Sequence, residues 1–256
     1  MNYNKISDII LKKIPEKPVT GIIFGSGLGV GISALKVIIR IPYIDIPSHP
    51  HSSARGHTGE WVFGYIDGQP IICANGRFHY YEGISLEETI ATVLIIHSLG
   101  CKKLIITNAA GSLNSKWELG DFMFIEGYID YSFLTNTEIP QIKKLKKRNH
   151  LFNKIKKITT NLQINLRKGI YTWTLGPSYE TYSEIQDIIS LGGNAVGMST
   201  APELKKALEL DMDVIGLSCL TNYGAGIIDL SINHNQIMEI TNQAQSKFSR
   251  LIKNII

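Results

Sequence analysis

Short apolar runs alternate with longer amphipathic segments along most of the chain. The predicted strands are Gly21–Phe24, Trp61–Ile66, Pro70–Ala74, Leu104–Thr107, Phe122–Glu126, Ile170–Trp173 and Val214–Cys219. The predicted helices, whose apolar residues recur at helical spacing, are Asn4–Lys12, Ser85–Leu99, Thr181–Leu191, Ala201–Leu210 and His234–Ile252. Strands that alternate with helices predict an α/β fold, with one domain over residues 1–256 and a largely parallel or mixed β-sheet.

Several local signals sharpen these boundaries. Asp67 and Gly68 separate two of the strands and predict a β-hairpin turn. Thr181 has Glu184 three residues later, which is the spacing of a helix capping box. Asn233 is expected to cap the last helix, with Gln236 as its capping-box partner.

The segment 142–162 is rich in lysine and differs from the rest of the chain. Ile142, Leu145, Phe152, Ile155 and Leu162 fall on one helical stripe, and lysines fill the other face. The favoured interpretation is a solvated surface helix. Binding to nucleic acid or to an anionic membrane is the alternative, but no aromatic side chains are interleaved with the lysines as a stacking platform.

Composition narrows the class of protein. The 256 residues are 44% hydrophobic and 19% charged, and no apolar run approaches the roughly 20 residues that span a bilayer. The N-terminal residues lack the long apolar core of a secretory signal. The three cysteines indicate buried thiols in a reducing compartment, so we expect a cytoplasmic protein. The net charge of +4 carries little functional weight.

A glycine-rich turn, Gly25-Ser26-Gly27-Leu28-Gly29, follows the first predicted strand. A dinucleotide fingerprint would need a small residue where Val30 stands and an acidic residue about 20 positions later. Asp45 lies at that distance but follows no clear strand, so the match is weak. Open N–H groups of Gly25 and Gly27 with the Ser26 hydroxyl would suit a free phosphate. A tight turn with a capping serine is the simpler alternative.

Further polar residues follow other predicted strands. Arg77 and His79 are two residues apart and would share one face of an extended segment, where they could bind phosphate. His57 lies in a flexible loop, and Ala109 lies in a run of small residues that lets a ligand approach the backbone. Ser199 stands at a strand end. Ligands of α/β sheets bind at such carboxyl ends, so these strings favour a common site.

Other residues suit a heterocycle. Tyr179 offers a flat face for stacking, and Glu180 beside it can accept hydrogen bonds. The side-chain amide of Asn222 can both donate and accept, which suits the edge of a heterocyclic base. His49 and His51 could suggest a metal pair, but no cysteine or carboxylate cluster lies alongside, so we expect a loop and no metal.

As a set, these strings resemble the trimeric class of purine nucleoside phosphorylases. The matching strings, in order, are GSGLG, GHTGEWVFG, GRFHYYEG, TNAAGSLN, GPSYETYSE, VGMSTAPE, LTN and NHNQ. The resemblance implies a twisted mixed sheet flanked by helices and a homotrimer. It implies reversible phosphorolysis of inosine and guanosine in purine salvage, with phosphate as a co-substrate and no cofactor, metal, nucleic acid or membrane partner.

The resemblance also implies a role for each matching residue. Phosphate would be held by Ser26, His57, Arg77, His79, the backbone N–H of Ala109, and Ser199. The nucleoside would be bound by Tyr81, Met198 and His234 at the ribose and by Tyr179, Glu180 and Asn222 at the base. Asn222, Glu180 and His79 would be the catalytic residues.

One segment departs from the family's pattern. Family members carry a longer stretch after the strand at Phe122–Glu126, with a phenylalanine that closes the ribose site of the neighbouring subunit. Here Gly127–Pro140 is short, and Phe133 is the only candidate substitute. Loss of this segment leaves open a nucleoside-binding protein without turnover, and a separate alternative is the related methylthioadenosine phosphorylase. Asn222 and His234 argue against the second, where aspartate and a small apolar residue are typical.

Overall fold

The computed structural model describes residues 3–51, 58–134, 138–145, 149–228 and 234–256. The strands are β1 (Thr20–Phe24), β2 (Lys36–Pro42), β3 (Glu60–Ile66), β4 (Gln69–Asn75), β5 (Lys103–Ser112), β6 (Phe122–Asp130), β7 (Lys143–Lys144), β8 (Leu166–Trp173), β9 (Ala195–Gly197) and β10 (Asp213–Tyr223). The α-helices are α1 (Tyr3–Leu11), α2 (Leu86–Thr89), α3 (Ala91–Ser98), α4 (Asn149–Asn161), α5 (Tyr182–Ser190), α6 (Ala201–Glu209) and α7 (His234–Ile255). Three short 3₁₀ helices are η1 (Gly29–Ala34), η2 (Tyr43–Asp45) and η3 (Tyr80–Glu82).

All these strands belong to one mixed sheet. β1 lies at its centre, parallel to β4 on one side and to β5 on the other. β4, β3 and β2 continue it as antiparallel neighbours to an edge. On the other side, β5 pairs with both β9 and β10, and the path through β6 and β8 joins these two, so this half of the sheet curls back on itself. The predicted α/β fold with a mixed sheet is confirmed.

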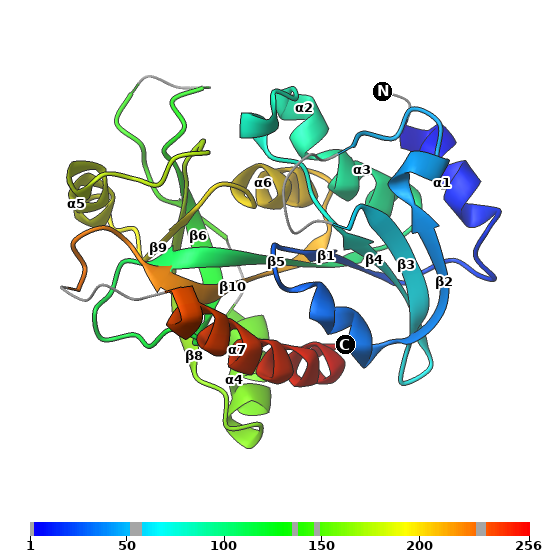
Figure 1. Cartoon of the computed structure of the whole chain (residues 1–256). Coiled ribbons are helices and arrows are strands. Elements are labelled where there is room, and N and C mark those ends of the chain that lie inside the picture. Colours follow the sequence, from blue (N-terminus) through cyan, green and yellow to red (C-terminus); the bar gives the residue numbers. More distant parts are fainter. Residues whose placement is uncertain (1–2, 52–57, 135–137, 146–148, 229–233) are drawn as a thin grey trace.

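Helices cover both faces of the sheet. Figure 1 shows α1, α3 and α6 over one face, and α4 and α7 over the other. Two apolar cores correspond to these layers: one includes Ile10, Ile96 and Leu204, and the other includes Ile155 and Phe248. Burial of both faces explains why the central strands read as continuous apolar runs.

The local sequence signals are confirmed where the structure describes them. Asp67 and Gly68 both have positive φ, at 47° and 82°, and join the antiparallel strands β3 and β4. The hydroxyl of Thr181 accepts a hydrogen bond from the backbone N–H of Glu184, and the Glu184 carboxylate accepts from the backbone of Thr181. Asn233, the expected cap of α7, lies outside the described residues.

Two sequence predictions need correction. The predicted helix Ser85–Leu99 is divided into α2 and α3 at Ile90. Residues 143–144 form β7, an antiparallel partner of β6, so the basic helix is only the shorter α4. Leu145 is buried beside this strand and not on a helix face. Edge strand β2 was not predicted, although Val37, Ile39 and Ile41 alternate along it, and only Ile41 of these is buried.

Among the helices of the described ranges, none has the length and apolar character required to cross a bilayer.

His49, one of the two histidines considered above as a metal pair, is buried in the structure. Trp61 Nε1 donates to His49 Nε2 at 2.9 Å, and His49 Nδ1 lies 2.7 Å from the carbonyl oxygen of Pro50. The imidazole also stacks on the ring of Tyr43, with ring centroids 4.1 Å apart. Both ring nitrogens are therefore used by the fold, with the proton on Nδ1 and the ring neutral.

This burial makes stability depend on pH. Burial lowers the pKa of His49 from 6.5 to about 4. Since the unfolded chain binds the proton more tightly, the contribution of His49 is complete above about pH 6.5 and is lost as pH falls toward 4. The loss amounts to about 3 kcal/mol of unfolding free energy. Denaturation at pH 7 and pH 4.5 tests this: we expect His49→Gln to reduce the difference by most of that amount. His51→Gln is the control: the charge of this exposed neighbour is the smallest cause of the His49 pKa shift, so its removal should change the pH dependence far less than His49→Gln does.

Candidate active site

A cavity of about 190 Å³ opens at the carboxyl ends of β1, β4, β5, β9 and β10. Its lining residues are Ser26, Arg77, His79, Tyr81, Asn108, Ala109, Ala110, Gly111, Tyr179, Glu180, Val196, Gly197, Met198, Ser199, Thr221 and Asn222. Ten of the residues predicted for the site are in this set. Of the other two, His57 lies outside the described residues, as does the side chain of His234 at the start of α7. The fold thus brings together polar residues that are up to about 200 positions apart in the sequence.

The glycine turn reaches this cavity, but one of its expected donors is used elsewhere. The backbone N–H of Gly25 donates to Thr107 Oγ1 at 3.2 Å, so it is not open to an anion as predicted. Gly25 is a glycine because a Cβ there would lie 2.6 Å from Cα of Asn108 on the adjacent strand. Gly27 has φ of 73°, which favours glycine. Ser26, between them, is the part of the turn that lines the cavity.

The elements that follow the turn also differ from those of a dinucleotide-binding fold. It is followed by the short helix η1 and then by edge strand β2, which is antiparallel to β3. A dinucleotide site needs a crossover helix followed by a parallel strand that ends near the acidic residue. Asp45 lies in η2 beyond an antiparallel strand.

Arg77 is the buried cation of the cavity, with a residue exposure of 1%. Its Nη1 donates to Ser199 Oγ at 3.1 Å and to Thr200 Oγ1 at 3.3 Å. Its Nη2 lies 3.0 Å from Glu203 Oε2. A guanidinium in a largely buried site attracts an anion far more strongly than one in bulk water. Arg77 therefore places a guanidinium at this end of the cavity, with Glu203 as its buried counter-ion.

His79 is oriented by a carboxylate that the sequence analysis missed. Glu82 Oε1 lies 3.0 Å from His79 Nδ1 and also accepts a hydrogen bond from the His79 backbone N–H at 2.9 Å. Burial lowers the pKa of His79, the Arg77 guanidinium lowers it further, and Glu82 opposes both effects. The signal was present in the sequence, since Glu82 follows His79 at the three-residue spacing of a capping box.

Aromatic side chains and Met198 form another side of the cavity. The ring of Tyr81 stacks on His79, with centroids 4.8 Å apart. A Cβ on Gly176 would lie 2.4 Å from Met198 Sδ, so the loop after β8 packs closely against this side. Tyr179 lines the cavity but is 80% exposed, which places its ring at the cavity mouth. These flat and apolar surfaces suit a heterocycle or a sugar ring.

Two polar side chains lie among these surfaces. Glu180 Oε1 accepts a hydrogen bond from Thr174 Oγ1 at 2.6 Å, which fixes one of its carboxylate oxygens. Asn222 follows a bulge in β10, where the register with β5 shifts between Leu220 and Asn222. Such bulges redirect side chains near functional sites. The Asn222 Oδ1 accepts from Thr221 Oγ1 at 3.1 Å, so this amide has a defined orientation.

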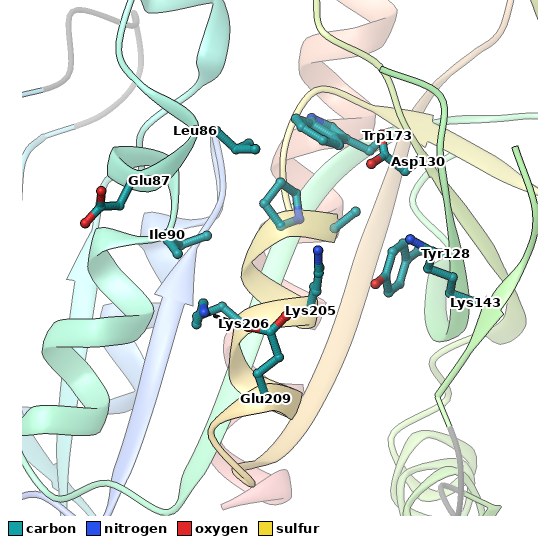
Figure 2. Close-up of a pocket in the computed structure, with 12 residues that line it drawn as sticks. Leu86, Glu87, Ile90, Tyr128, Asp130, Lys143, Trp173, Lys205, Lys206 and Glu209 are labelled. Atoms are coloured by element: carbon teal, nitrogen blue, oxygen red, sulfur yellow. Dashed lines mark ion pairs between the residues drawn. The ribbon is translucent and has the colours of Figure 1, made fainter. Parts of the chain in front are cut away.

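A larger cavity, of about 310 Å³, lies elsewhere on the molecule, between α2, α6 and strands β6 and β8 (Figure 2). It is lined by Leu86, Glu87, Ile90, Tyr128, Asp130, Lys143, Trp173, Ala201, Pro202, Lys205, Lys206 and Glu209. None of the predicted site residues belongs to this set. Its three lysines are matched by three carboxylates, and Lys206 Nζ pairs with Glu209 Oε2 at 2.5 Å. Its lysines are thus compensated, and it holds none of the clustered hydroxyl, guanidinium and amide groups that line the smaller cavity.

Comparison with known proteins identifies the family of this chain. Residues 20–256 match the family described as the Phosphorylase superfamily. The chain belongs to this superfamily. It is 36% identical to purine nucleoside phosphorylase 1 of Geobacillus stearothermophilus, over 98% of this chain and 94% of that protein. The resemblance to purine nucleoside phosphorylases that was inferred from the sequence is therefore confirmed.

Solved structures of purine nucleoside phosphorylases share the fold of this chain. A Schistosoma purine nucleoside phosphorylase in complex with hypoxanthine has a TM-score of 0.82 and 30% identity, covering 99% of this chain and 95% of that chain. Isoform 2 of the Schistosoma mansoni enzyme, in complex with cytosine and ribose-1-phosphate, has a TM-score of 0.85 and 30% identity, with the same coverage. The fold of this chain is that of the purine nucleoside phosphorylases.

Proposed function

We propose that this superfamily member catalyses reversible phosphorolysis of 6-oxopurine nucleosides, such as inosine and guanosine and their deoxy forms. The products are the free purine base and ribose 1-phosphate or its deoxy form. One observation carries the proposal: Arg77, His79 and Ser199 line the same cavity as Glu180 and Asn222. An anion subsite thus adjoins a set of groups suited to a heterocyclic base.

In the proposed reaction, the phosphate dianion is held by Ser26, Arg77, His79, Ser199 and the Ala109 backbone N–H. The ribose lies against Tyr81 and Met198. As the bond between C1′ and purine N9 breaks, its electrons move onto the purine and positive charge develops on the ribose. Phosphate stabilises this cation and then forms the new C1′–O bond. The contribution of the protein is positioning and electrostatic stabilisation.

The base would be recognised at two edges. Asn222 would donate to O6 and accept from N7 as this atom gains a proton. Glu180 would accept from the N1–H of a 6-oxopurine, with Thr174 holding its other oxygen. Adenine has no N1–H and carries a donor at position 6, so it would leave both residues poorly paired. This mismatch is the physical basis for the proposed preference.

Wider aspects of the proposal follow from the resemblance to the trimeric class. They are a homotrimer, one phosphorylase domain over residues 1–256, and a cytoplasmic role in purine salvage. Phe133 has an exposure of 47% and contacts Tyr131, with ring centroids 5.0 Å apart. It does not line the cavity of its own chain.

A substrate panel tests the proposed specificity. With phosphate present, the purified protein should release base from inosine and guanosine. With adenosine, kcat/KM should be lower by roughly 10²-fold or more. Methylthioadenosine as the best substrate would transfer the assignment to the related phosphorylase. Binding of inosine with no base release would instead indicate a nucleoside-binding protein without turnover.

A further inference from the structure

Behind the cavity lies a buried carboxylate that does not line it. Glu203 stands in the first turn of α6 and is 2% exposed, and its Oε2 is 3.0 Å from Nη2 of Arg77. Burial raises the pKa of Glu203, while the adjacent guanidinium opposes that rise and favours the ionised form. Charges taken out of water in this way persist only with a partner, because removing one leaves the other buried and unpaired.

The two ends of the Arg77 guanidinium are used differently. Nη2 faces Glu203, which does not line the cavity. Nη1 donates to the hydroxyl oxygens of Ser199 and Thr200, of which Ser199 lines the cavity. Hydrogen bonds at Nη1 and an ion pair at Nη2 hold opposite sides of this planar, rigid group. Glu203 thus contributes one of the contacts that restrain how Arg77 faces the cavity.

The same network holds a strained backbone. Thr200 has φ of 74° and ψ of −47°, and the Ala201 N–H donates to the Ser199 carbonyl at 2.8 Å to close a tight turn. This γ-turn geometry is rare and costly for a β-branched residue. The Thr200 hydroxyl oxygen accepts from Arg77 and also from Asn108 Nδ2 at 2.9 Å. Such strain persists only where surrounding contacts fix it, and Arg77 supplies one of them.

We propose that Glu203 is a positioning residue for the phosphate site, acting through Arg77 on the orientation of Ser199 and Thr200. The inference rests on the proposed function, because that function assigns phosphate to this end of the cavity. Glu203 itself touches no substrate. It holds the guanidinium so that Nη1 and the Ser199 hydroxyl meet an incoming phosphate without rearrangement, with Thr200 Oγ1 as a supporting acceptor.

Whether removal of the Glu203 charge weakens or strengthens phosphate binding distinguishes positioning from simple charge compensation. If Glu203 only offset the charge of Arg77, then removing its negative charge would strengthen phosphate binding. If Glu203 positions Arg77, then its removal lets the unpaired guanidinium turn toward water, and phosphate binding weakens. A purely structural role would reduce the amount of folded protein and leave both Michaelis constants unchanged.

The test is Glu203→Gln, with Glu203→Asp as a variant that keeps the charge. We expect Glu203→Gln to raise KM for phosphate roughly ten- to hundredfold, by analogy with other residues that orient ligand-binding groups. KM for inosine should stay within about twofold. Glu203→Asp should recover part of the phosphate affinity. Glu209→Gln on the same helix removes an exposed carboxylate and should change neither constant.

Phosphate affinity measured by calorimetry makes the test independent of turnover. If the unaltered protein binds phosphate but performs no phosphorolysis, the proposed function is wrong, and the affinities of the variants still test Glu203. If Glu203→Gln does not fold, Glu203→Asp carries the comparison and should bind phosphate more weakly than the unaltered protein. An unchanged or stronger phosphate affinity in the folded variants overturns the inference. So does the absence of any phosphate binding by the unaltered protein.

Discussion

Replacing Arg77 by methionine is expected to lower kcat/KM for phosphate by about 10²- to 10³-fold, because truncating one partner of a buried, hydrogen-bonded charge pair costs about 2–5 kcal/mol of binding. Arg77 is the buried cation of the cavity, and its Nη1 also orients the hydroxyl of Ser199. Methionine keeps the length of the side chain but supplies neither charge nor donor. The measurement is initial rate against phosphate concentration at saturating inosine. The loss should appear mainly in KM for phosphate.

This substitution also affects folding. It leaves Glu203 buried without its partner, which typically costs about 3–5 kcal/mol of stability. The folded fraction should therefore be measured beside the kinetics, and Arg77→Lys is the informative second variant. Lysine retains the charge but not the planar donor geometry, so an intermediate loss is expected. Arg167→Met is the control: it removes an arginine that pairs with Asp121 and does not line the cavity. If folded Arg77→Met keeps KM for phosphate within a few-fold, the anion subsite is misplaced.

Replacing Asn222 by alanine is expected to lower kcat for inosine by about 10²- to 10³-fold, with KM for phosphate little changed. In the proposed mechanism Asn222 acts on the purine as negative charge develops there, so its loss affects the transition state more than the bound substrate. Pre-steady-state base release measures the chemical step directly. Asn222→Asp should also favour adenosine relative to inosine, because a carboxylate accepts from a 6-amino group and repels O6.

Asn254→Ala is a matched control for this prediction. Asn254 is exposed on α7, and its amide donates to the Arg250 carbonyl at 2.8 Å. Its replacement should leave the rates with both nucleosides unchanged. Equal losses for Asn222→Ala in the phosphate and nucleoside constants would indicate general damage to the cavity and contradict the specific role.

The sequence predicted the fold and most of the residues that line the cavity, because both depend on local patterns. The central strands are continuous apolar runs, and the candidate site residues follow them, at the carboxyl ends where α/β sheets bind ligands. The bulge before Asn222 and the close approach of Gly25 to Asn108 depend on registers between distant strands, so no local signal reveals them. Edge strand β2 did carry a local signal, the alternation of Val37, Ile39 and Ile41, which the prediction overlooked.

The residues that escaped prediction act through other residues. Glu203 looked like an ordinary acidic residue of a helix first turn, and its contact with Arg77 joins positions more than 120 residues apart. Thr174 and Asn108 likewise act through single hydrogen bonds, to Glu180 and Thr200. Of these four supporting residues, Glu82 is the one with a local signal in the sequence, its capping-box spacing from His79. The contacts of such supporting residues can be identified only from the three-dimensional structure, in which the sheet brings distant loops together.

The central claim is that the cavity joins phosphate to the ribose of a purine nucleoside. The most direct test is phosphorus NMR of the purified protein with inosine and inorganic phosphate, with parallel detection of hypoxanthine. We expect ribose 1-phosphate and hypoxanthine to appear in equal amounts, and neither product to form when phosphate is omitted. Hypoxanthine release without phosphate, accompanied by free ribose, would contradict the account, because the reaction would then be hydrolysis and the anion subsite would have no part in it.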